Sequence, residues 1–129
     1  MLRHLRALAD QGSDFAFETT LASRSYAPWL RKLKEDGYTI GLIFLWLDHP
    51  DLAVERVKAR VGAGGHSIPE TTIRRRYERG IINLFDLYMP LVDNWQIFDN
   101  TAREPKLIAS KSGVTEAIAD EGVWRRLKK

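Results

Sequence analysis

Residues 39–47 read TIGLIFLWL, and the run Ile40–Leu47 is the longest apolar stretch of the chain. The stretch does not alternate between apolar and polar residues, as a strand with one wet face does. A continuous apolar run bounded by turns is typical of a strand buried on both faces, in a parallel sheet covered by helices. We therefore predict a strand of that kind over Ile40–Leu47.

Helical patterns flank this strand. Before it, Pro28 suits a first helical turn and Gly37 sits where a C-cap glycine belongs. After it, Asp48 can cap a helix through "DLAVERVKARV", and a long helix is expected from about Glu70 to Met89. The segment "PKLIAS" predicts a short strand, and the tail after Gly113 predicts a last helix.

Strands that alternate with helices indicate an α/β fold with parallel strands and right-handed crossovers. The predicted parallel strands are Phe15–Glu18, Ile40–Leu47 and Gln96–Asp99. The predicted core consists of apolar residues from these strands and from the helices, namely Phe17, Leu42, Phe44, Leu45, Val57, Ile73, Ile81, Leu84 and Ile97.

The length of 129 residues corresponds to one domain, residues 1–129. Hydrophobic residues make up 44% and charged residues 29%, which is a globular composition. No apolar run approaches the roughly 20 residues that span a bilayer, and the N-terminus is charged throughout. We therefore expect a cytoplasmic protein without a membrane partner. The absence of cysteine excludes disulfide scaffolds, thiolate metal sites and cysteine nucleophiles.

The net charge of +3 is concentrated in one segment. Residues 56–79 hold seven Lys/Arg and two Asp/Glu, whereas the other residues hold thirteen and fifteen. A local basic segment in a nearly balanced chain favours an anion site over a broad nucleic-acid surface.

Within the basic segment, Arg56 and Arg60 are four residues apart and share a helix face. Arg75 and Arg76 lie with two further arginines near the start of the next helix, where cations oppose the helix dipole unless an anion sits among them. Arginine is well shaped for bidentate phosphate contacts. The alternative is a solvated charged face with nearby glutamates as surface partners.

Other motifs are weaker. Glu18 and Thr20 end the first predicted strand, where a carboxylate and a hydroxyl can bind a sugar or orient a reacting hydroxyl, or can be solvated strand-end residues. His66 follows a glycine pair and reads as a loop residue, and no histidine spacing suggests a metal site. The sequence contains no GxxxxGK[ST] motif and no Ser-His-Asp pattern.

Taken in order, several motifs resemble the zeta-toxin-like P-loop kinases. They are "FAFETTL", "GYTIGLIFLWL" with "PDLAVERVKARV", "GGHSIP" with "IRRRYERG", and "NLFDLYMPLVDNW" with "FDN". The resemblance covers about Leu5 to Asn100, and its specificity lies in the series.

The resemblance implies a nucleotide-kinase-like α/β core, ATP with magnesium as phosphoryl donor, and UDP-N-acetylglucosamine or a related sugar nucleotide as acceptor. Glu18 and Thr20 match the motif that contacts the acceptor, and Arg24 stands near the place of an arginine that follows it in the toxins. Arg56 matches a lid arginine that reaches the ATP phosphates. The second lid arginine falls near His66, so the further phosphate-binding candidates are His66 itself, Arg60, Arg75 and Arg76.

One departure from the family is large. The strand, Walker A loop and helix that begin these kinases have no counterpart here, so the chain reads as the C-terminal portion of such a domain: a partial P-loop-kinase-like parallel sheet flanked by helices. Phosphoryl transfer depends on positioning and charge neutralisation by those parts. We therefore assign no catalytic residue and expect no activity from the chain alone. The alternative is a non-catalytic phosphate-ligand or protein-interaction module, with an antitoxin or a second copy as partner; nucleic-acid binding ranks last.

Overall fold

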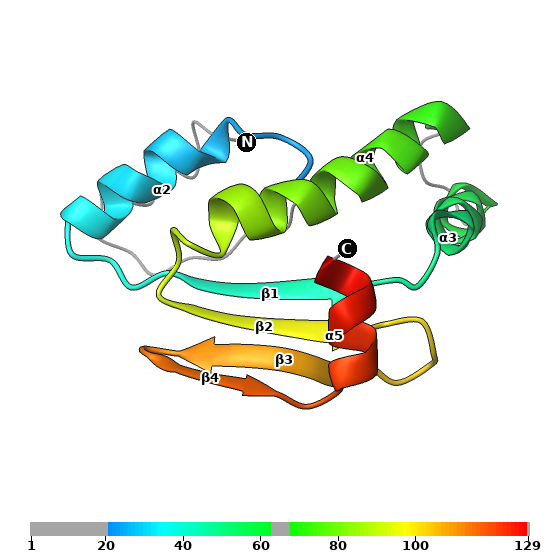
Figure 1. Ribbon diagram of the computed structural model, residues 1–129. Coiled ribbons are helices and arrows are strands. Elements are labelled where there is room, and N and C mark those ends of the chain that lie inside the picture. Colours follow the sequence, from blue (N-terminus) through cyan, green and yellow to red (C-terminus); the bar gives the residue numbers. More distant parts are fainter. Residues whose placement is uncertain (1–20, 63–67, 129) are drawn as a thin grey trace.

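The computed structural model describes residues 21–62 and 68–128. Within these ranges the helices and strands follow one another as shown in Figure 1. They are α2 (Tyr26–Glu35), β1 (Gly41–Trp46), α3 (Pro50–Gly62), α4 (Glu70–Asn83), the π-helical turn η1 (Leu84–Tyr88), β2 (Asn94–Asp99), β3 (Lys106–Ser112), β4 (Thr115–Ile118) and α5 (Glu121–Lys128).

The four strands form one mixed sheet in the order β1-β2-β3-β4. β1 and β2 are parallel, in register from Gly41 opposite Asn94 to Trp46 opposite Asp99, as predicted. β3 and β4 run antiparallel to their neighbours, which corrects the expectation of an all-parallel sheet. The reason is the length of the connections: the short link from β2 to β3 cannot hold a crossover. Gly113, at φ +61°, turns the chain directly from β3 into β4.

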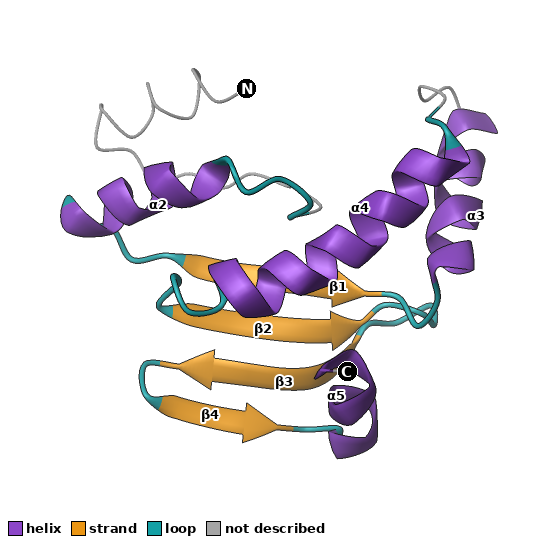
Figure 2. Ribbon diagram, turned by 45° about the horizontal axis from the view of Figure 1, so that its top comes forward, coloured by secondary structure: helices purple, strands orange, loops and turns teal. Residues whose placement is uncertain are grey.

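The helices α2, α4 and α5 all lie on one face of the sheet, as both ribbon views show (Figures 1 and 2). α3 lies beyond the carboxyl end of β1 and packs beside α4; Val54 of α3 and Ile73 of α4 are buried. No helix in the two described ranges is long and apolar enough to cross a membrane.

The core fills the space between the sheet and these helices. Trp95 of β2 stacks on Trp124 of α5, with ring centroids 5.8 Å apart and planes inclined by 10°. Phe85 meets the same Trp124 ring at 5.6 Å. Ile97 and Leu84 are completely buried next to them. Burial of several large aromatic side chains anchors the short helix α5 to the sheet.

The opposite face of the sheet carries no helix among the described elements. Ile43 and Leu45 of β1 point to that face and are 65% and 53% exposed. β1 therefore alternates in burial, and the prediction that it is buried on both faces was wrong for the described part of the chain. The assignment of Leu45 to the core was wrong for the same reason.

The other residues of the predicted core differ in how deeply they are buried. Ile73, Leu84 and Ile97 are buried, as predicted. Four others are half-buried: Leu42, Phe44, Val57 and Ile81. Phe17 and the predicted strand Phe15–Glu18 lie outside the described residues.

The helix predictions hold with two changes. α2 begins near Pro28 and is followed by Gly37 at φ +94°, as its sequence indicates. The long helix predicted to reach Met89 contains a π turn in its last part. The tail after Gly113, predicted as one helix, first completes a β-hairpin, because the positive φ of Gly113 reverses the chain.

Candidate functional site

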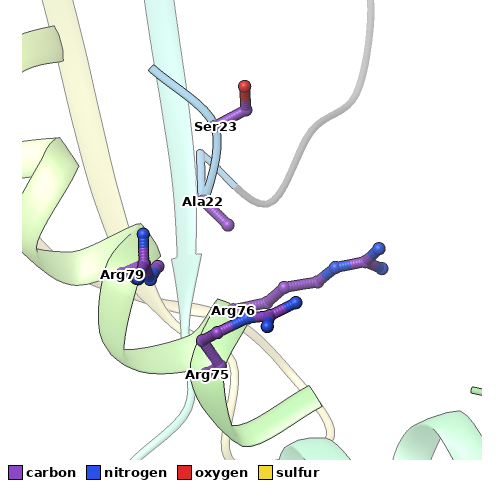
Figure 3. Close-up of a pocket in the computed structure, with 5 residues that line it drawn as sticks. All are labelled: Ala22, Ser23, Arg75, Arg76 and Arg79. Atoms are coloured by element: carbon purple, nitrogen blue, oxygen red, sulfur yellow. The ribbon is translucent and has the colours of Figure 1, made fainter. Parts of the chain in front are cut away.

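A basic pocket lies where α4 meets the segment that precedes α2. It has a volume of about 310 Å³ and is open to solvent. Figure 3 shows Arg75 and Arg76 extending to one side of α4, below Ala22, with Arg79 one turn further along the helix. We call this cavity the basic pocket. The residues that line it are Ala22, Ser23, Arg75, Arg76 and Arg79.

Helical periodicity separates the arginines of α4 into two groups. Arg75 and Arg79 are four residues apart and so share a face, with Arg76 next to them. Arg74 instead turns toward α3, where its Nη2 donates hydrogen bonds to Asp51 and, at 2.9 Å, to Glu70. The face between the two groups is the one that buries Ile73.

The two groups differ in their partners. The hydrogen bond from Arg74 holds the pKa of the Asp51 carboxyl below its usual range and raises the pKa of Arg74 itself. The side chains of Arg75, Arg76 and Arg79 make no ion pair or hydrogen bond with any residue of the described ranges. Three guanidinium groups without carboxylate partners repel one another, and an anion between them relieves that repulsion.

The opposite wall of the pocket is a short turn, Leu21–Ser23, in an unusual backbone conformation. Leu21 has φ +61°, although its side chain is 4% exposed and fits in the core. A left-handed conformation costs a residue with a side chain about 1–2 kcal/mol, so neighbouring groups must stabilise it. The Asn83 amide donates to the carbonyls of Leu21 (2.7 Å) and Ala22 (3.1 Å). The Tyr88 hydroxyl donates to the carbonyl of Ser23.

The predicted phosphate ligands do not all lie in the same pocket. Arg75 and Arg76 line the basic pocket, whereas Arg56 and Arg60 do not. Arg56 donates from Nη2 to the carbonyl of Thr101 at 3.1 Å, which ties α3 to the loop after β2. Arg60 is exposed on the last turn of α3.

The predicted acceptor ligands are described only in part. Arg24 is exposed, and its guanidinium approaches Oδ1 of Asn83 at 3.5 Å, next to the Leu21–Ser23 turn. Glu18, Thr20 and His66 lie outside the described residues.

The chemistry of the pocket suits phosphate oxygens better than a metal ion. Guanidinium groups are hydrogen-bond donors only, and magnesium needs oxygen ligands. The pocket-lining residues include no carboxylate, and in the described ranges no group of three or more His, Asp or Glu side chains is arranged so that it could hold a metal ion. The lining therefore suits an anion with phosphate-like oxygens, while a magnesium ion would have to be held by other groups.

Comparison with known proteins assigns the chain to a family. The family model of the zeta toxin matches residues 2–104. The chain belongs to the zeta toxin family. The α/β architecture of the domain agrees with this membership.

One curated relative is similar in sequence, but its description names no activity. It is an uncharacterized protein of Haemophilus influenzae, 33% identical over 63 residues. The match spans 49% of this zeta toxin family chain and 45% of the relative, so the chain covers less than half of that protein's length. No solved structure matches the chain.

Sequence reasoning missed three residues of this region as site residues. Arg79 shares the face of Arg75, a relation visible in the four-residue spacing. Asn83 and Tyr88 carried no signal of their own, because their role depends on a contact with a turn about 60 residues earlier in the chain.

Proposed function

We propose that this zeta toxin family chain forms the phosphate-binding side of an ATP-dependent small-molecule kinase, with the basic pocket holding phosphate oxygens of the nucleotide. The observation that carries the proposal is the group of three α4 arginines that have no acidic partner in the described ranges. Arg74, on the same helix, shows the contrasting arrangement of an arginine paired with two carboxylates.

The acceptor in this proposal is a sugar nucleotide such as UDP-N-acetylglucosamine. Its support is the resemblance of the "FAFETT" motif to the acceptor motif of the zeta toxins, with Glu18 and Thr20 as ligands. Arg24, which lies beside the Leu21–Ser23 turn, is a third acceptor ligand in the proposal. A diphosphate on the acceptor would also be attracted by the positive charge of the neighbouring pocket.

The 129 residues alone should not turn over substrate. They contain no GxxxxGK[ST] motif, so no P-loop lysine holds the β- and γ-phosphates. Phosphoryl transfer is accelerated almost entirely by such positioning and by charge neutralisation. Incubation with ATP, magnesium and UDP-N-acetylglucosamine should give no phosphorylated sugar above a blank without protein, and steady turnover would contradict this part.

Binding is the experiment that tests the pocket. We expect ATP to bind the chain weakly, in the millimolar range, because exposed charge pairs contribute only about 0–1 kcal/mol each. Arg76→Ala should weaken this binding, whereas Arg31→Ala, which removes an equal charge from the exposed side of α2, should not. Equal effects of the two substitutions would show that ATP responds only to net charge.

The uncovered face of the sheet supports a second candidate, a protein-interaction module. Leu45, Phe98 and Leu107 lie in neighbouring register positions on that face. Apolar side chains exposed together favour association, here with a second copy or an antitoxin. Sedimentation equilibrium of the wild-type chain and of Leu45→Lys would test it: a dimer that the substitution dissociates supports this function, and a monomer in both contradicts self-association.

A further inference from the structure

We infer that Asn83 and Tyr88 are positioning residues of the basic pocket, which hold the Leu21–Ser23 turn in the conformation that completes its phosphate site. The inference rests on the proposed function of the pocket and adds to it the groups that shape its second wall. Neither side chain lines the pocket, so both would act through the backbone of the turn.

The π turn explains why these two side chains face the same segment. Asn83 and Tyr88 are five residues apart and stand at the two ends of η1 (Leu84–Tyr88). In an α-helix with 3.6 residues per turn, side chains five apart point in different directions. A π turn closes at i to i+5, as in the 2.8 Å hydrogen bond from the Met89 amide to the Leu84 carbonyl, and brings such residues to one side.

The hydrogen bonds of these residues fix three successive carbonyl groups. Asn83 is 5% exposed and binds the carbonyls of Leu21 and Ala22, while Tyr88, 1% exposed, binds that of Ser23. Side chains this deeply buried cannot exchange their backbone partners for bulk water. The turn is therefore held along its whole length, which includes the left-handed residue Leu21.

One helical stretch thus shapes both walls of the pocket. α4 supplies the guanidinium groups of Arg75, Arg76 and Arg79, and its C-terminal end with η1 fixes Ala22 and Ser23 opposite them. A bound anion needs a fixed distance between the walls, because charge-assisted hydrogen bonds depend on geometry. Release of the turn should lower phosphate affinity although every arginine remains.

The test compares two tyrosine hydroxyls. Tyr88→Phe removes the hydroxyl that binds Ser23, and Tyr77→Phe removes a matched hydroxyl that binds the Leu47 carbonyl at 2.5 Å, away from the turn. Each variant is titrated with inorganic pyrophosphate by NMR, and the backbone chemical shifts of Leu21 are recorded as a report of its positive φ. Asn83→Ala is measured in the same way. If Asn83→Ala fails to fold, the comparison of Tyr88→Phe with Tyr77→Phe still tests the inference.

We expect Tyr88→Phe to raise the Kd for pyrophosphate roughly three- to tenfold, the equivalent of one hydrogen bond, and to shift the Leu21 signals. Tyr77→Phe should leave the Kd for pyrophosphate and the Leu21 signals unchanged. If the wild type binds pyrophosphate and Arg76→Ala weakens it, but Tyr88→Phe binds like the wild type, the inference is overturned and the proposed function survives. If the wild type does not bind, or Arg76→Ala binds equally well, both are overturned.

Discussion

The hydroxyl of Tyr88 donates a hydrogen bond to the backbone carbonyl of Ser23 at 2.5 Å, across 65 residues of sequence. This contact joins the C-terminal end of the α4–η1 helix to the turn before α2. Since α4 also carries the arginines of the basic pocket, the contact links the formation of the pocket to the packing of the core.

Asn83→Ala should destabilise the fold by about 1–3 kcal/mol, because the carbonyls of Leu21 and Ala22 lose a buried partner. The left-handed Leu21 would thereby lose one of the contacts that stabilise it. Urea denaturation measures the change, with Asn100→Ala as control, a half-exposed asparagine in the loop directly after β2. A change no larger than that of the control would show that Asn83 does not hold the turn.

The two faces of the sheet should respond differently to truncation. Ile97→Ala should cost about 2–5 kcal/mol, since Ile97 is completely buried under the helices. Leu45→Ala on the uncovered face should change the stability by no more than about 0.5 kcal/mol. Comparable losses at the two positions would mean that another group covers Leu45.

Burial raises the pKa of the Tyr88 hydroxyl above its ordinary value, and the same holds for Tyr77. A raised folded pKa means that the fold favours the neutral hydroxyl, which is the hydrogen-bond donor. The resulting stability is complete below about pH 10, the pKa of a free tyrosine, and is lost as the pH rises through the folded pKa. An ultraviolet titration should detect tyrosines that ionise late, together with alkaline unfolding. Tyrosines that all ionise with the ordinary pKa would refute this.

The ion pairs among Glu70, Arg74 and Asp51 connect α3 with α4 on an exposed surface. Asp51→Asn should lower the melting temperature only slightly, and the difference should shrink in salt because exposed charges are screened. The pKa of Asp51 is lowered, so its contribution is present above pH 3.8, its unshifted value, and fades as the pH falls through the lowered pKa. A difference that persists unchanged in 1 M salt would indicate a contact other than the ion pairs.

The sequence predicted those elements whose signals are local. The apolar run gave the position of β1, the spacing of apolar residues gave the helices, and a basic helix face gave Arg75 and Arg76. Exposure of Ile43 and Leu45 could not be predicted, because a continuous apolar run does not reveal which of its faces the other elements cover.

In the candidate site, too, local sequence signals and tertiary contacts give different answers. Arg56 has the residue type and the spacing of a phosphate ligand, yet the structure joins it to Thr101. Asn83 and Tyr88 look like ordinary helix residues, and their role depends on a π turn that propensities do not reveal. Tertiary contacts, which decide these roles, are not encoded in local periodicity.

The most direct test of the account is to record the Nε–Hε NMR signals of the arginine side chains during a titration with ATP. We predict that the signals of Arg75, Arg76 and Arg79 shift together with one apparent Kd, and that raising the salt concentration weakens the effect. The signals of Arg56 and Arg60, which do not line the pocket, should stay in place. Shifts at Arg56 and Arg60 without shifts at the α4 arginines, or equal shifts at every arginine, would contradict a phosphate site in the basic pocket.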